Sequence, residues 1–199
     1  MDKIIADLKF YAGTTPETPQ TYAIRGPITA EDIRALVNLP FEVSITEQNR
    51  RLVLSPGQRS TSHHKADTDT SDRHQFSRLS FHTHRRVPGE RLSTPSLSDL
   101  YQSLFRAEAG GLANMLADQN GLIMFSFDRE QLNNEENRDL LEQLIDAKSD
   151  GELTDAELAY HQLLQRKFAE RTGAIVMQAS WEDHDKIEQI MSQFRTAVE

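Results

Sequence analysis

The spacing of apolar residues along the chain predicts both strands and helices. Alternating apolar and polar residues predict a β-hairpin over 41–54 and a further strand over 76–84. An Asn-Gly pair at 120–121, between two apolar runs, predicts a second hairpin. Apolar residues at helical spacing predict helices at four places: 29–39, 95–109, parts of 129–171, and a last one carrying 187–198.

Other segments carry different patterns. Residues 1–24 mix short apolar pieces with a Thr/Pro-rich turn, and we expect a strand or an irregular entry there. Residues 55–75 contain almost nothing apolar and are expected to form a loop, whereas the run 174–177 predicts a short buried strand. The order of these elements indicates an α/β or α+β fold. We expect a core over 1–128 and a helical extension over 129–199, whose strand and terminal helix pack on the core.

The composition is acidic and lean in apolar residues, with 199 residues, a formal charge of −9 and a mean hydropathy of −0.60. That length fits one domain with a small appendage, and the charge argues against nucleic-acid binding, since phosphate contacts need a basic face. There is no cysteine, so disulfides are excluded and metal ligands must be His, Asp or Glu. We find no apolar run long enough for a signal peptide or a membrane span, and therefore expect a soluble, cytoplasmic protein.

Two histidines on the strand after the polar loop are the strongest chemical signal. Because side chains alternate along a strand, His82 and His84 project to the side opposite Phe81, close enough to share one cation. Asp99, on the next predicted helix, would add a carboxylate. Two imidazoles, one carboxylate and an open fourth position indicate a catalytic zinc site. Taken alone, Ser96-x-x-Asp99 is equally a helix capping box.

In their order, these elements resemble the JAMM (JAB/MPN/Mov34) metalloprotease domain over 22–128. The shared series is a helix, Glu at the start of a strand, a hairpin, a variable loop, a strand ending in His-x-His, a Ser-x-x-Asp helix and an Asn-Gly hairpin. The resemblance implies a mixed β-sheet flanked by helices, with the three residues just described as zinc ligands. It also implies that Glu42 moves a proton from the attacking water to the leaving amine, and that Ser96 donates a hydrogen bond to the oxyanion.

The chain departs from the family at two points. Arg85 stands where the family usually has proline, and the interval between His84 and Asp99 is longer than usual. The insertion concerns the rim of the site and therefore the substrate. Glu47 lies near enough along the chain to stay an alternative to Glu42 as the base.

A second pattern lies outside the resemblance, because residues 146–157 closely follow the twelve-residue EF-hand loop. Asp146, Asp150 and Glu157 occupy ligand positions, and a glycine occupies the sharp turn. Lys148, however, replaces an oxygen ligand with a positive charge. The segment therefore indicates either a weak or vestigial calcium site or a plain helix–turn–helix.

Three functions follow from these residues. The first is a zinc metallopeptidase or isopeptidase of JAMM type, which cleaves an amide bond in a protein or peptide; the tail of a ubiquitin-like protein is one candidate substrate. The second is a non-catalytic MPN-like binding or assembly module, a class in which the ligand set is typically broken. The third is a PHP-type phosphoesterase, which needs more downstream ligands than His161 and His184 supply. The intact ligand set favours the first.

Overall fold

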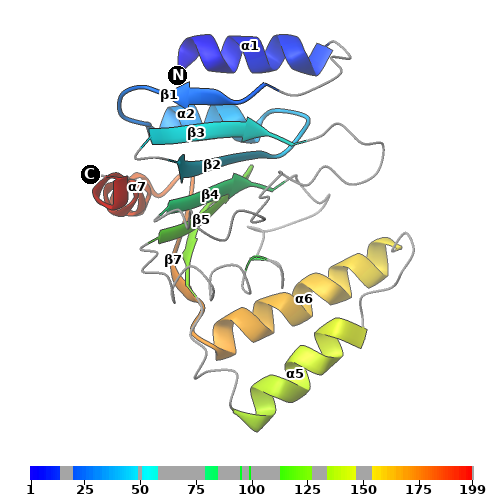
Figure 1. Cartoon of the computed structure of the whole chain (residues 1–199). Coiled ribbons are helices and arrows are strands. Elements are labelled where there is room, and N and C mark those ends of the chain that lie inside the picture. Colours follow the sequence, from blue (N-terminus) through cyan, green and yellow to red (C-terminus); the bar gives the residue numbers. More distant parts are fainter. Residues whose placement is uncertain are drawn as a thin grey trace.

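The fold is described from a computed structural model of the chain (Figure 1). The structure describes these residues: 1–13, 20–48, 51–57, 79–84, 95, 99, 113–126, 134–146 and 154–198. Their elements in chain order are α1 (Asp2–Gly13), β1 (Tyr22–Ile24), α2 (Ala30–Val37), β2 (Val43–Gln48), β3 (Arg51–Pro56), β4 (Leu79–Thr83), β5 (Ala113–Asp118), β6 (Gly121–Phe125), α5 (Glu135–Asp146), α6 (Asp155–Arg171), β7 (Ile175–Ser180) and α7 (His184–Val198).

Seven strands of the described part form one mixed sheet in the order β1-β3-β2-β4-β5-β6-β7. β4 and β5 run parallel, and every other neighbouring pair is antiparallel. The expected mixed sheet flanked by helices is confirmed at this level. β7 and α7 follow residue 128, yet β7 extends the same sheet and α7 contributes to the core around β4.

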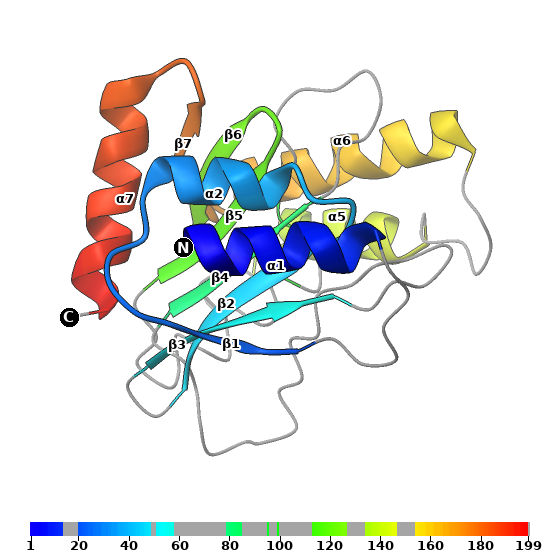
Figure 2. The same cartoon turned by 90° about the horizontal axis from the view of Figure 1, so that it is seen from above.

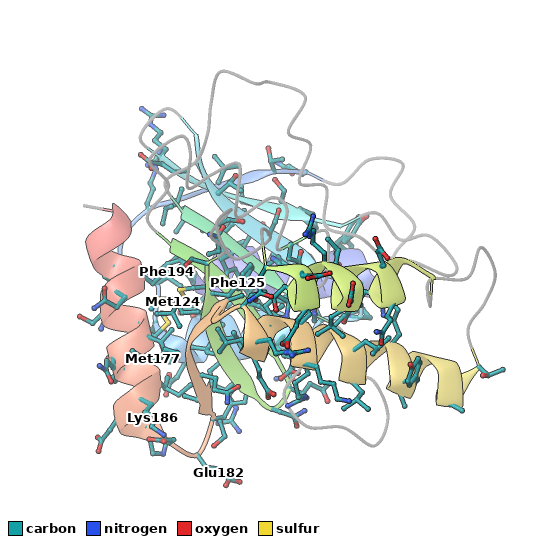
Figure 3. The ribbon with its side chains drawn as sticks, turned by 90° about the horizontal axis from the view of Figure 1, so that it is seen from below. Met124, Phe125, Met177, Glu182, Lys186 and Phe194 are labelled. Atoms are coloured by element: carbon teal, nitrogen blue, oxygen red, sulfur yellow. The ribbon has the colours of Figure 1, made fainter. Side chains whose placement is uncertain are left out.

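Helices α1, α2 and α7 cover one face of the sheet (Figures 1 and 2). Phe81 of β4 is fully buried there, with its ring edge-on to Phe194 of α7 and the centroids 6.3 Å apart. Met115 belongs to this core, and Met124 and Met177 lie between the sheet and α7 (Figure 3). Each buried aromatic or aliphatic side chain of this face stabilises the fold by about 1.5–3 kcal/mol.

The helical hairpin of α5 and α6 packs on the opposite face. Leu116, Ile123 and Phe125 form a second core cluster with residues of that hairpin, among them Leu164 and Phe168. Neighbouring residues along β5 and β6 therefore alternate between the two cores, as the two-residue repeat of a strand requires. Leu116 pairs with His82 of β4, and paired residues of neighbouring strands share a face. The α5–α6 hairpin thus lies on the histidine face of the sheet.

Local signals account for the elements that the sequence predicted correctly. The side chains of Thr29 and Asp32 form a reciprocal capping box at the start of α2. The β5–β6 hairpin turns through Gln119-Asn120, where Oδ1 of Asp118 accepts hydrogen bonds from the backbone N–H groups of Asn120 and Gly121 at 2.6 and 3.1 Å. Gly121 is the first residue of β6. Only glycine fits there, because a Cβ would lie 1.9 Å from the carbonyl oxygen of Ala179 on β7.

Four expectations were wrong. Residues 2–13 form a helix, not a strand or irregular entry, since Ile5 and Leu8 share one helical face and are buried. β7 is an edge strand and Val176 is 55% exposed, so that strand is not buried. On α6, the apolar residues at helical spacing (Tyr160, Leu163, Leu164 and Phe168) predict one buried face, but only Leu164 and Phe168 are buried, and Tyr160 and Leu163 are exposed. The predicted 55–75 loop starts too early, because Ser55 and Pro56 still belong to β3. Residues 58–75 and most of the predicted 95–109 helix lie outside the described residues.

Candidate metal centre

β4 delivers two imidazoles to the same place. The Nε2 atoms of His82 and His84 lie 3.0 Å apart, and their side chains are 10% and 20% exposed. The alternation of side chains along the strand explains this placement. Phe81 points into the core with α7, so His82 and His84 point to the opposite face of the sheet. The backbone N–H of His84 is held by the carbonyl of Ala117 on β5 at 2.8 Å, which fixes the end of the strand.

Asp99 brings a carboxylate to both rings. Its Oδ1 lies 3.2 Å from Nε2 of His82, and its Oδ2 lies 3.4 Å from Nε2 of His84. The side chain of Asp99 is 13% exposed. Within the described part of the chain, these three are the residues that could jointly hold a metal ion, with all three ligand atoms within 4.8 Å of one another. The sequence prediction named the same three residues.

The donor atoms lie close enough together for one metal ion to reach all three residues. At Zn–N and Zn–O distances of about 2.0–2.1 Å, neighbouring ligands of a tetrahedron lie about 3.3–3.4 Å apart. The two Nε2 atoms lie 3.0 Å apart, and each lies 3.2 or 3.4 Å from a different oxygen of Asp99. With one ligand atom per residue, the three atoms lie within 4.8 Å of one another, which a shared ion could bring closer. Hydrogen bonds alone suit the arrangement less well, because each Nε2 carries at most one in-plane hydrogen and faces two partners. One cation at the centre would satisfy both imidazoles and the carboxylate together, and nitrogen and carboxylate donors of this kind are ones that zinc accepts.

The electrostatics of the centre are those of a carboxylate paired with two imidazoles. Burial raises the pKa of Asp99, but the charge and hydrogen bond of His82, joined by those of His84, outweigh it and hold that pKa well below its usual range. Burial likewise lowers the pKa of His84, yet its hydrogen bond to Asp99 and the nearby negative charges raise it overall. The centre therefore attracts positive charge, either a proton or a metal cation.

Glu42 directly precedes β2, the strand next to β4. β2 and β4 are antiparallel, and their pairing ends with Ser44 opposite His82. Extending that register by two residues puts Glu42 opposite His84. The Glu42 charge acts on His84 and raises its pKa, which supports this proximity. The carbonyl of Glu42 accepts a 2.7 Å hydrogen bond from Gly57, and the residue is half-buried. Glu47 lies five residues further along the chain, and by the alternation of β2 it faces the other side of the sheet.

Two residues near the centre were missed from the sequence. Asp118 is 1% exposed, and its charge also raises the pKa of His84 from the β5 side. Thr83, between the two histidines, accepts a buried hydrogen bond from the backbone of Val43. The parallel pairing of β4 with β5 places Asp118 next to His84, and that pairing has no short-range signal in the sequence. Ser96, the expected oxyanion donor, lies outside the described residues.

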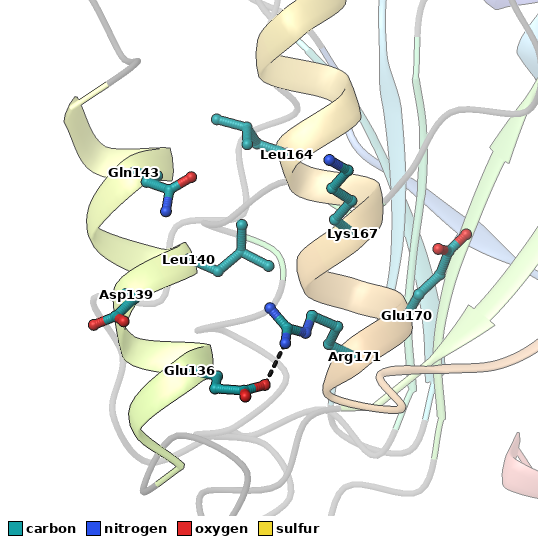
Figure 4. Close-up of a pocket in the computed structure, with 8 residues that line it drawn as sticks. All are labelled: Glu136, Asp139, Leu140, Gln143, Leu164, Lys167, Glu170 and Arg171. Atoms are coloured by element: carbon teal, nitrogen blue, oxygen red, sulfur yellow. Dashed lines mark hydrogen bonds and ion pairs between the residues drawn. The ribbon is translucent and has the colours of Figure 1, made fainter.

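The structure describes the two helices that flank the expected calcium site, but not the loop between them. α5 ends at Asp146 and α6 begins at Asp155, so the helices flank the loop as an EF-hand pattern predicts. Asp150 and the side chains of Asp146 and Glu157 lie outside the described residues. Nearer the other end of this hairpin, a groove between the two helices is crossed by an ion pair of Glu136 with Arg171 (Figure 4). Both partners are largely exposed, so the pair contributes at most about 1 kcal/mol.

Comparisons with known proteins give no family. Neither protein-family models, nor curated proteins, nor solved structures match this chain. Among the described residues, no helix combines the length and apolar character needed to cross a membrane. The candidate metal centre is therefore interpreted from its own geometry and from the resemblance of its motifs.

Proposed function

We propose that the chain is a zinc-dependent hydrolase of JAMM type that cleaves an amide bond. The observation that carries the proposal is the convergence of the imidazoles of His82 on β4 and of His84, directly after β4, with the Asp99 carboxylate, close enough to share one metal ion. His82, His84 and Asp99 would hold the metal through three protein ligands. Such a set leaves a fourth position for water, which separates catalytic from structural zinc sites.

The chain's own residues divide the remaining chemistry. A bound zinc ion would lower the pKa of a water molecule to about 7 and polarise the substrate carbonyl. Glu42, which the β2–β4 register extended by two residues puts opposite His84, would accept the proton of the attacking water and return it to the leaving nitrogen. Protonation of that nitrogen matters because an amine anion is a poor leaving group. By the resemblance, Ser96 would donate a hydrogen bond to the developing oxyanion.

A protein or peptide is the substrate class that the proposal favours, and the tail of a ubiquitin-like protein is one candidate. The support is the resemblance in motif order together with the acid–base residue that amide cleavage requires. The mixed sheet flanked by helices is compatible with the same family. Soluble, cytoplasmic action belongs to the proposal as well.

The first test is metal content. Purified protein should contain about one zinc per chain, and His82→Ala should lose it. His184→Ala is the matched control, because His184 is exposed at the start of α7 and should leave zinc unchanged. Equal zinc in wild type and His82→Ala would refute the ligand assignment.

The second test is turnover on a panel of ubiquitin-like conjugates and short peptides. Glu42→Gln should keep zinc and lower kcat by at least about 100-fold, the size typical of a lost general base. Glu47→Gln is the control on the same strand and should retain activity. Zinc-loaded protein that cleaves nothing in the panel would point instead to the non-catalytic binding module. Full activity of Glu42→Gln would remove the proposed base.

A further inference from the structure

A threonine hydroxyl joins the two strands that carry the candidate centre. The backbone N–H of Val43 donates a 2.8 Å hydrogen bond to Oγ1 of Thr83, and both residues are buried, at 0% and 2% exposure. This bond lies one residue beyond the last paired residues of β2 and β4, Ser44 and His82. A side-chain hydrogen bond therefore joins β2 and β4 just beyond the last backbone-paired residues of the two strands.

The positions of the two partners make this bond specific to the site. Val43 directly follows Glu42, and Thr83 stands between His82 and His84. By strand alternation, Val43 and Thr83 point away from the face that carries the imidazoles. The hydroxyl therefore cannot touch a substrate or a metal on that face. It can act only through the backbone.

We propose that Thr83 is a positioning residue that holds Glu42 against the histidine pair. The inference rests on the proposed function, in which Glu42 is the base. On its β3 side, Glu42 is fixed by the 2.7 Å bond from Gly57 to its carbonyl. On its β4 side, the bond to Thr83 fixes the next residue, so the two bonds together set the start of β2 relative to β4. Without the hydroxyl, the buried N–H of Val43 loses its acceptor and the start of β2 moves away from β4 to find water.

The test compares two substitutions of nearly equal size. Thr83→Val keeps the shape and removes the acceptor, whereas Thr83→Ser keeps the hydroxyl and removes a methyl group. Thr172→Val is the matched control: Thr172 is 5% exposed and its hydroxyl donates a 2.7 Å bond to Phe168, in the helix turn after α6. Three quantities are measured on each variant: amide hydrogen exchange at Val43, the position of Glu42 in a crystal structure, and kcat and KM with zinc content.

In Thr83→Val we expect the Val43 amide to exchange about tenfold faster, the size of one lost hydrogen bond. The Glu42 carboxylate should move by about 1 Å or more, and kcat should fall by roughly 10- to 100-fold with KM and zinc content unchanged. Thr83→Ser should restore all three, and Thr172→Val should change none of them. A role in stability alone would lower the melting temperature of both valine variants without a selective loss of kcat.

Two results overturn the proposal: unchanged Val43 exchange in Thr83→Val, or an unmoved Glu42 carboxylate in that variant. Should Thr83→Val not fold, exchange in the wild type decides, because fast exchange at Val43 would show that the bond does not hold the strand. Failure of the proposed function has a different signature. In that case the wild type cleaves no substrate, while the exchange and the crystal structures still show whether Thr83 positions Glu42.

Discussion

Replacing Asp99 by asparagine tests the candidate metal centre at the residue on which it most depends. Asparagine keeps the size of the side chain and one oxygen, but it removes the negative charge that contacts both imidazoles at 3.2 and 3.4 Å. Because the Asp99 side chain is only 13% exposed, bulk water is poorly placed to replace the lost ligand. We therefore expect Asp99→Asn to fold and to bind zinc at least about 100-fold more weakly, since even supporting residues of zinc sites contribute 10- to 100-fold.

This change in affinity has a measurable thermal consequence. With zinc at about 100 times the wild-type Kd, binding stabilises the folded state by about 2.7 kcal/mol. For a chain of 199 residues, each kcal/mol raises Tm by about 2–4 °C, so zinc should raise the wild-type Tm by about 5–11 °C. In Asp99→Asn the same zinc concentration equals the new Kd. The stabilisation then falls to about 0.4 kcal/mol and the Tm shift to about 1–2 °C.

The assay is thermal unfolding with and without zinc, on protein first stripped of metal. Asp183→Asn is the control, because Asp183 caps α7 far from the histidines in sequence and asparagine caps helices as well as aspartate does. That control should keep the full zinc shift. A zinc-induced shift in Asp99→Asn equal to that of the wild type would show that Asp99 is not a ligand.

The remaining predictions concern pH and the fold. Zinc affinity should fall by up to about tenfold per pH unit as the pH drops through the raised pKa of His84. The reason is that a proton competes with zinc for the ring nitrogen, while Asp99, whose pKa is lowered, stays ionised. Calorimetric titrations that show constant zinc affinity from about pH 8 to 5 would contradict this. Gly121→Ala should lower the free energy of unfolding by at least about 2 kcal/mol, since its Cβ would meet the Ala179 carbonyl at 1.9 Å; an unchanged denaturation midpoint would be the contrary result. Phe168→Ala should lower the free energy of unfolding by about 3–5 kcal/mol, because the ring of Phe168 on α6 is fully buried in the core between the α5–α6 hairpin and the sheet. A decrease under about 1 kcal/mol by chemical denaturation would show that the hairpin does not depend on this ring.

Short-range signals explain which parts of the fold the sequence predicted. The capping residues Thr29 and Asp32 mark the start of α2 within four positions, and the turn after Asp118 marks the β5–β6 hairpin equally locally. The burial of β7 was mispredicted because its sequence does not say which strands will flank it. Its one neighbour is β6, so Val176 faces outward at the edge of the sheet.

The candidate site was predictable to the extent that it depends on strand geometry. Alternation alone places His82 and His84 on one face, and the structure brings their Nε2 atoms to 3.0 Å. The place of Glu42 depends on the pairing of β2 with β4, which joins segments separated by a long interval. Thr83 gave no signal, because a hydroxyl that bonds to a distant backbone N–H looks like any strand threonine. Such contacts arise only from the register.

The sheet by itself does not account for the position of Asp99. Both imidazoles and Glu42 are held by strand alternation and register, so their proximity needs no ligand. Asp99 is not part of any described strand, and to lie largely buried between two imidazoles its carboxylate must be compensated by positive charge. Without a metal that charge is a proton, which is why the pKa of His84 rises while that of Asp99 falls. A zinc ion would supply the same compensation and would also direct both ring nitrogens and the carboxylate to one point. Because the two ring nitrogens and the carboxylate already converge, a metal cation and a proton would compete for the same place.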